Sequence, residues 1–327
     1  MFVVGSKGLC GQLYHKDQMP ENFHEMYIVK GYRNPRSSPS QCILSLFAAT
    51  NETLNFWTHF LPSVYFMWIL RDLAVNLDFR HDSFTWPLLA YVVMCCIYPL
   101  TSAVAHLFNT MSDNARHICF FLDYSAISAM TVSVAISYKA YCFPSELRFT
   151  FLWEVFIPVT IANSVLCLIV ACKTRLLPAS LLRKVIRLSG LGLPCIFTTL
   201  PIMYRLIAGT QQELNLSSRY YHGISFFFLF MSAFLYGSHL PERWFPGSFD
   251  FIGHSHQLFH VCTILGTMTQ MQAILHDMYE RREDLIQEWQ FEKASSSVGL
   301  LAQVIGVNTI VVSIYSYLLY KNKLKSA

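Results

Sequence analysis

Eight apolar segments, each long enough to cross a lipid bilayer, are the feature that most limits what this chain can fold into. A spanning helix needs about 20 mostly apolar residues. The approximate limits of the segments are 55–73, 84–108, 118–138, 150–172, 188–209, 220–240, 255–275 and 298–320. Inside a bilayer the backbone must satisfy its own hydrogen bonds, which favours helices for such segments. The sequence therefore predicts an all-α, polytopic membrane bundle.

The chain divides into four predicted parts. These are a cytosolic N-terminal segment (1–54), a seven-helix transmembrane core (55–275), an extracellular loop (276–297), and an eighth transmembrane helix with a short basic tail (298–327). Only 13% of the residues are charged, whereas a soluble domain carries about 25%. The net charge of +4 is spread along the loops, so the charge pattern gives no indication of a nucleic-acid partner.

The N-terminal segment contains a helix-start pattern before the first span. Ser38 suits the N-cap, Pro39 the first helical position, and Gln41 the residue that completes a capping box. We expect a short helix from there to Thr50, lying at the cytosolic surface of the membrane.

The distribution of lysine and arginine predicts the orientation, because these residues concentrate in cytosolic loops. With a cytosolic N-terminus, fifteen of the 24 basic residues fall on the cytosolic side, five of them between Lys173 and Arg187. We therefore expect cytosolic N- and C-termini in a multi-pass protein.

Three histidines lie where a membrane protein rarely carries ionisable groups without a function. His256 and His260 are four residues apart, which places both on one helical face. His106 lies near the end of the second span, and the predicted orientation brings it to the same cytosolic layer. Three histidine ligands with an open fourth position are typical of a catalytic zinc. His254 is excluded because a two-residue offset points it away from this face.

Two further residues suit a zinc site that performs chemistry. Asp123 falls in the same layer and would accept a proton from a zinc-activated water. Ser102 stacks one turn before His106, where its hydroxyl would support the histidine or the water. Alternatives remain open at this stage. Asp123 would otherwise pair with Arg116 or cap the third span, and the zinc would otherwise be structural, tying three helices together.

A second polar stripe enters the membrane with the first span. Glu52, Asn55 and His59 recur at intervals of three and four residues. For Asn55 and His59 we expect hydrogen bonding between helices, as small polar side chains provide in membrane bundles. The phenylalanines near Phe226 in the sixth span are more simply core or lipid-facing residues than a ligand pocket.

Five motifs, in order along the chain, resemble those of the progestin and adipoQ receptor family. They are residues 25–33 (E-x-x-I-x-x-G-Y-R), 51–59 (N-E-T-x-N-x-W-T-H), 102–106 (S-x-x-x-H), 122–125 (L-D-Y-S) and 253–260 (G-H-S-H-Q-L-F-H). Within that family the chain resembles the membrane progestin receptor branch, its gamma-like group in particular. The eighth span fits this branch, since the related adiponectin receptors have seven.

The resemblance implies a receptor at the plasma membrane that binds a progestin and signals on binding it. It implies a zinc held near the cytosolic face by His106, His256 and His260, with Ser102 and Asp123 nearby. The wider superfamily includes alkaline ceramidases, which use a similar histidine set on a lipid amide. A zinc-dependent hydrolase of ceramide or a related lipid, regulated by steroid, is therefore the alternative function. Coupling to a G protein is left open.

Overall fold

The computed structural model describes residues 12–177, 181–288 and 296–326. Its main elements are β1 (Tyr14–His15), β2 (Lys30–Tyr32), α1 (Pro39–Leu44), α2 (Thr53–Asn76), α3 (Trp86–Phe108), α4 (Asp113–Ser137), α5 (Phe151–Arg175), α6 (Leu181–Ala208), α7 (Gln211–Leu214), α8 (Ser218–Ser238), α9 (Ser255–Glu280), α10 (Arg282–Glu288) and α11 (Ser296–Ser326). Residues 289–295 of the predicted extracellular loop, and Lys7 of the predicted cytosolic segment, lie outside the described residues.

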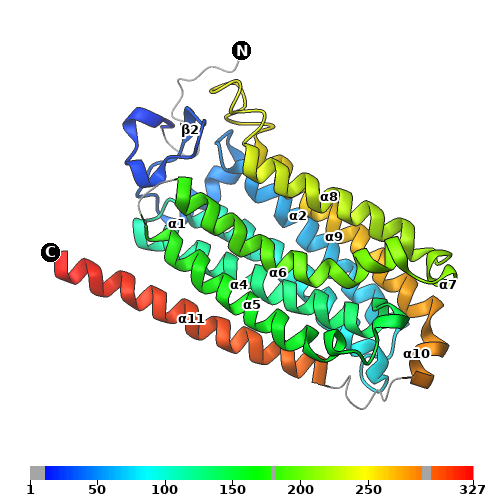
Figure 1. Cartoon of the computed structure of the whole chain (residues 1–327). Helices are drawn as coiled ribbons and strands as arrows, with labels where there is room; N and C mark the ends of the chain where they lie inside the picture. Colours follow the sequence, from blue (N-terminus) through cyan, green and yellow to red (C-terminus); the bar gives the residue numbers. More distant parts are fainter. Residues whose placement is uncertain (1–11, 178–180, 289–295, 327) are drawn as a thin grey trace.

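The long helices run side by side in one bundle, which confirms the predicted all-α membrane architecture (Figure 1). Six helices within the described residues, α3, α4, α5, α6, α9 and α11, are long and apolar enough to cross a membrane. The other two predicted spans coincide with α2 and α8, which are long but less apolar because each carries several polar residues. Crossing by these two helices stays a prediction. In Figure 1, β2 and the C-terminal end of α11 lie at the same end of the bundle, as an even number of crossings requires.

Several helices extend beyond the predicted spans. α4 begins at Asp113, where the Ser112 hydroxyl accepts a hydrogen bond from the Ala115 amide, whereas the predicted span begins at 118. α9 continues to Glu280 rather than ending at 275, and α10 follows at once. The region from 276 to 288 is therefore largely helical and not an open loop. Apolar length alone underestimates these helices, because the polar first turn of α4 and the polar last turn of α9 lie outside the apolar part.

The N-terminal segment packs over the end of the bundle where α3 ends and α9 begins. β1 and β2 form a small antiparallel pair that the sequence did not predict. The Asp250 carboxylate, in the loop after α8, accepts hydrogen bonds from the amides of Val29 and Lys30, both at 3.0 Å. Gly31 has φ +87°, and a Cβ there would lie 2.7 Å from the Phe251 ring. The hairpin is thus held tightly against the α8–α9 connection.

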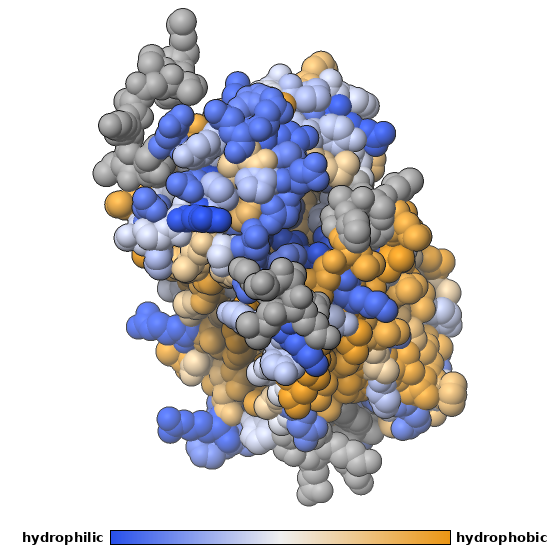
Figure 2. Space-filling view, turned by 90° about the vertical axis from the view of Figure 1, so that its left-hand side faces the viewer, coloured by the Kyte–Doolittle hydropathy of each residue, from blue (hydrophilic) through white to orange (hydrophobic). Residues whose placement is uncertain are grey.

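The short helix α1 confirms the predicted start signal. Ser38 caps it, the capping box with Gln41 is complete, and Pro39 is the first helical residue. Exposed Ile43, Leu44 and Phe47 lie on α1 and the turn after it. Figure 2 shows polar residues gathered in the upper part of one face of the molecule, and a broad apolar surface below them.

α11 packs against α4, α5 and α3 on the outside of the bundle. Its seam is formed by Leu301, Val304 and Val312, which are almost fully buried. Between them the Asn308 amide donates to the carbonyl oxygen of Ser125 on α4, at 3.1 Å. A hydrogen bond at the interface of two packed helices fixes their register relative to each other.

Candidate functional site

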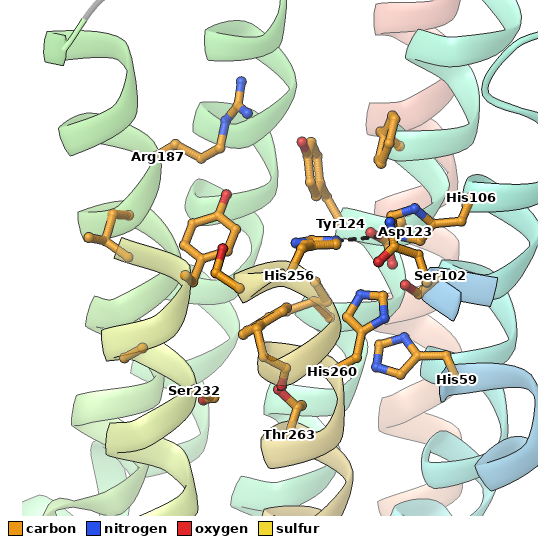
Figure 3. Close-up of a pocket in the computed structure, with 18 of the residues that line it drawn as sticks. His59, Ser102, His106, Asp123, Tyr124, Arg187, Ser232, His256, His260 and Thr263 are labelled. Atoms are coloured by element: carbon orange, nitrogen blue, oxygen red, sulfur yellow. Dashed lines mark hydrogen bonds between the residues drawn. The ribbon is translucent and has the colours of Figure 1, made fainter. Parts of the chain in front are cut away.

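His106, His256 and His260 meet inside the bundle, although 150 residues separate the first two. Their nearest ring nitrogens all lie within 4.8 Å of one another, a geometry that could hold a metal ion. His106 is in the last turn of α3, whereas His256 and His260 are in the first two turns of α9. Figure 3 shows the three rings turned toward one another. The His256 Nε2 and His106 Nε2 atoms are 3.2 Å apart. The convergence that the sequence predicted is therefore present.

The Glu52 carboxylate holds His106. It lies just before α2, and its Oε2 atom is 2.7 Å from Nδ1 of His106. The amides of Asn109 and Asn55 donate to Glu52 at 2.7 and 2.8 Å. Burial raises the pKa of Glu52, but the neighbouring His106 ring, the Arg33 cation and the Asn55 amide together bring it well below its usual range. An ionised carboxylate only accepts, so Nδ1 of His106 donates to Glu52, and Nε2 of His106 faces the other two histidines.

Thr58 fixes His260 in the same way. Its Oγ1 atom lies 3.0 Å from Nδ1 of His260 and donates its own proton to the carbonyl oxygen of Leu54, at 2.7 Å. The threonine oxygen therefore accepts from Nδ1 of His260, which leaves Nε2 as the free nitrogen. The Nε2 atoms of two rings on different helices thus face one point.

Anchors outside the membrane-spanning helices position the ends that carry the histidines. Arg33 donates to the carbonyl oxygens of His106 and Leu107, at 2.6 and 2.8 Å, where the end of α3 leaves such groups unpaired. Glu242 accepts from the Ser255 amide at 2.7 Å and from its hydroxyl, which places a carboxylate at the N-terminus of α9. His254 points away from the group, as expected, and lies 3.3 Å from the carbonyl oxygen of Asn51.

A cavity of about 1790 Å³ extends from the three histidines into the bundle. Residues of the N-terminal segment, including Glu25 and Tyr27, line its mouth. Its walls come from α2, α3, α4, α5, α6, α8, α9 and α11 and are mostly apolar, with Phe226 and Leu229 among them. Phe226 belongs to the buried core as well as to the cavity wall, whereas Phe227, Phe230 and Phe234 are exposed, as expected of core and lipid-facing residues. A cavity of this size is large enough for a steroid or a lipid chain.

Asp123 and Ser102 line the same cavity beside the histidines (Figure 3). The alternative roles considered for Asp123 are wrong, because Arg116 pairs with Glu25 at 2.5 Å and Ser112 caps α4. Asp123 has no side-chain hydrogen bond or ion pair to any residue that the structure describes.

Two arginines of the cavity wall, Arg175 on α5 and Arg187 on α6, also have no carboxylate partner among the described residues. Arg175 lies over the Phe120 ring at 3.9 Å, and Arg187 over the Tyr124 ring at 6.0 Å. This wall of the cavity is therefore positively charged.

Sequence reasoning missed the roles of Glu52 and Thr58, and it misjudged two other residues of the polar stripe. Asn55 bonds to Glu52 of its own segment instead of to another helix. His59 stacks on His260, with ring centroids 3.6 Å apart, and does not form the predicted bond between helices. The spacing of Glu52, Asn55 and His59 did show that one face of α2 is polar. It did not show which residues of the other helices that face contacts.

A second group with metal-ligand atoms lies at the opposite end of the bundle, formed by Cys142, His222 and Asp277. Here the donor set does not fit a metal. The two oxygens of Asp277 already accept from both Nη atoms of Arg205, at 2.6 and 2.7 Å, and from Ser218 and His222. A metal ion would compete with the guanidinium for the same carboxylate. This group is a buried ion network that joins α6, α8 and α9.

Comparison with known proteins places these residues in a wider context. A family model described as haemolysin-III related matches residues 47–271. Membrane progestin receptor gamma of Homo sapiens is 42% identical over 305 residues, covering 92% of each chain. Membrane progestin receptor gamma-B of Danio rerio is 40% identical over 338 residues, covering 96% of each. Membrane progestin receptor delta of Homo sapiens is 41% identical over 313 residues, covering 93% of this chain and 90% of the relative.

Proposed function

The chain belongs to the haemolysin-III-related family, as do the membrane progestin receptors, and we propose that it is a membrane receptor for a progestin steroid. The observation that carries the proposal is the large, mostly apolar cavity inside the bundle of a chain that is 42% identical to such a receptor over nearly its whole length. Binding shifts a conformational equilibrium only if the steroid prefers one of two states. The cavity is lined by eight helices and by the N-terminal segment, so a steroid in it contacts several separate elements of the bundle at once.

We assign the three histidines to one zinc ion near the cytosolic face. The N···N distance of 3.2 Å supports this, because ligands of a tetrahedral zinc with bonds of 2.0–2.1 Å lie roughly 3.3 Å apart. The tautomers set by Glu52 and Thr58 also suit metal binding, since they direct Nε2 of His106 and of His260 inward. Loop charges favour cytosolic N- and C-termini, and similarity to membrane receptors favours the plasma membrane. A cytosolic partner such as a G protein would then respond to the conformation of the bundle.

The second candidate function is a lipid amide hydrolase. It is favoured by Asp123 and Ser102, which line the cavity beside the histidines, and by the two arginines that lack a carboxylate. Zinc would supply Lewis acidity to the amide carbonyl. The Asp123 carboxylate would accept the proton of the attacking water and pass it to the amine that leaves as the C–N bond breaks. Ser102 would hold the water, and Arg175 and Arg187 would give the released fatty acid a counter-charge.

One experiment separates the two functions. We expect the purified protein, reconstituted in lipid, to bind radiolabelled progesterone saturably. Fatty-acid release from ceramide is then measured with and without progesterone, against His260→Ala. Release that requires His260 and rises with progesterone makes the protein a steroid-regulated enzyme. Binding without release, by folded and zinc-loaded protein, leaves a receptor with a structural zinc, and absence of saturable binding contradicts the receptor proposal.

Replacing Glu52 by glutamine is expected to weaken zinc binding by about 10–100-fold, the usual effect of losing the outer carboxylate of a metal-bound histidine. Glutamine keeps the shape and an acceptor for Nδ1 of His106 but removes the negative charge. Zinc affinity is measured by competition with a chelator. Glu283→Gln, the same change on the exposed surface of α10, serves as the control and should leave the affinity unaltered. Equal affinities in the two variants would contradict the assigned role of Glu52.

A further inference from the structure

His59 on α2 is a buried imidazole that the arrangement of the three histidines does not use. Its side chain is 4% exposed and lines the cavity. Neither Nδ1 nor Nε2 has a hydrogen-bond partner among the residues that the structure describes. A buried polar group without a partner loses the free energy of a hydrogen bond, so such groups usually meet a partner that the protein chain does not supply.

The position of His59 is fixed by ring contacts. It stacks nearly parallel on His260, with an interplanar angle of 15°, and the two rings lie side by side in Figure 3. The Tyr98 ring approaches edge-on, at 6.2 Å between centroids. His59 does not belong to the group of three whose ligand atoms converge. It therefore forms the wall of the cavity next to the metal site, one ring thickness from His260.

Several neighbouring polar side chains already have partners, although the Asp123 carboxylate and the Asn55 amide oxygen in the same cavity do not have one among the described residues. The Tyr98 hydroxyl and Thr267 Oγ1 are 2.9 Å apart, and Thr263 donates to the carbonyl oxygen of Phe259 at 2.8 Å. Deeper in the bundle, the Gln270 amide bonds to Tyr91 and to Tyr138, at 3.0 and 2.7 Å. The hydrogen-bonding capacity of His59 is thus available to an occupant, whereas the capacity of these neighbours is largely taken.

We infer that His59 recognises the ligand by a hydrogen bond to an uncharged oxygen, a carbonyl or a hydroxyl group. A neutral imidazole offers one donor and one acceptor, which suits either group. A carboxylate or phosphate would instead be drawn to the arginines on the α5–α6 wall. The inference rests on the proposed function, because it takes the cavity to be the ligand site, and for a progestin the recognised group is a ketone oxygen.

The test uses His59→Phe, which keeps a flat ring on His260 and removes both nitrogens. Zinc content and saturation binding of radiolabelled progesterone are measured on the full-length protein reconstituted in lipid. We expect zinc to stay stoichiometric and progesterone to bind about tenfold more weakly, the effect of one lost hydrogen bond. Two progesterone analogues, each with one ketone replaced by a methylene, identify the oxygen. The analogue that lacks the recognised ketone should bind the wild type and the variant equally.

Two results would overturn this inference and leave the proposed function intact. Unchanged progesterone affinity in zinc-loaded His59→Phe would show that the ring makes no bond to the ligand. Loss of zinc together with binding would make His59 a residue that merely positions His260. By contrast, no saturable progesterone binding by the wild type would overturn the proposed function and this inference with it. His276→Phe, on the far half of α9, is the control and should bind like the wild type.

Discussion

Zinc content is expected to fall from stoichiometric to background when His260 is replaced by alanine. The substitution removes a proposed ligand that is 1% exposed and whose Nδ1 atom is held by Thr58, and the methyl group of alanine cannot coordinate a metal. Two histidines would remain, which is fewer than the protein ligands of known catalytic or structural zinc sites. The measurement is elemental analysis of zinc in protein purified without added metal.

His276→Ala is the matched control, since His276 lies on the same helix, is partly exposed and contacts Glu280 at 3.3 Å. It should keep its zinc. Size-exclusion profiles of both variants would show whether the bundle has formed. Stoichiometric zinc in a folded His260→Ala protein would remove His260 from the ligand set and with it the zinc assignment.

The second large effect concerns the ion network at the other end of the bundle. Asp277→Asn is expected to lower the free energy of unfolding by about 3–5 kcal/mol, because it leaves a buried arginine without its counter-charge. Arg205 is 2% exposed and Asp277 is fully buried, so water cannot replace the lost carboxylate. The loss is read from the melting temperature of the purified protein in detergent.

Asp72→Asn is the same chemical change at an exposed position on α2, and it should shift stability by no more than about 0.5 kcal/mol. Replacing Arg205 and Asp277 together by apolar residues of similar volume should restore part of the loss, because a missing pair costs less than a broken one. A single Asp277→Asn variant that melts like the wild type would mean that the network adds little to stability.

The sequence predicted those parts of the molecule that depend on local spacing. His256 and His260 are four residues apart, so both side chains face the same way once α9 is helical. The apolar segment that contains them predicts that α9 is helical. The alternation of spans then determines that the end of α3 and the start of α9 lie at one end of the bundle. These steps use only periodicity and chain direction, which a single sequence contains.

Side-chain partners were harder to predict, because they depend on how the helices rotate about their own axes. Asp123 and Glu52 are both carboxylates near the predicted histidine layer, and nothing in their spacing shows which of them bonds to His106. The structure places Glu52 there because α2 begins with its polar face against the end of α3. The β1–β2 hairpin was missed for a similar reason, since Asp250, which holds it, lies about 220 residues away in the chain.

The order of these residues along the chain has a consequence for biosynthesis. His106, Glu52 and Thr58 leave the ribosome early, whereas His256 follows His106 by 150 residues. At 5–20 residues per second this delay is roughly 8–30 s, so α2 and α3 are synthesised well before α9. A three-histidine zinc site cannot be complete before α9 is inserted. Metal loading would then be a late step of biogenesis. A chain truncated before α9 would lack two of the three histidines and would not bind the metal.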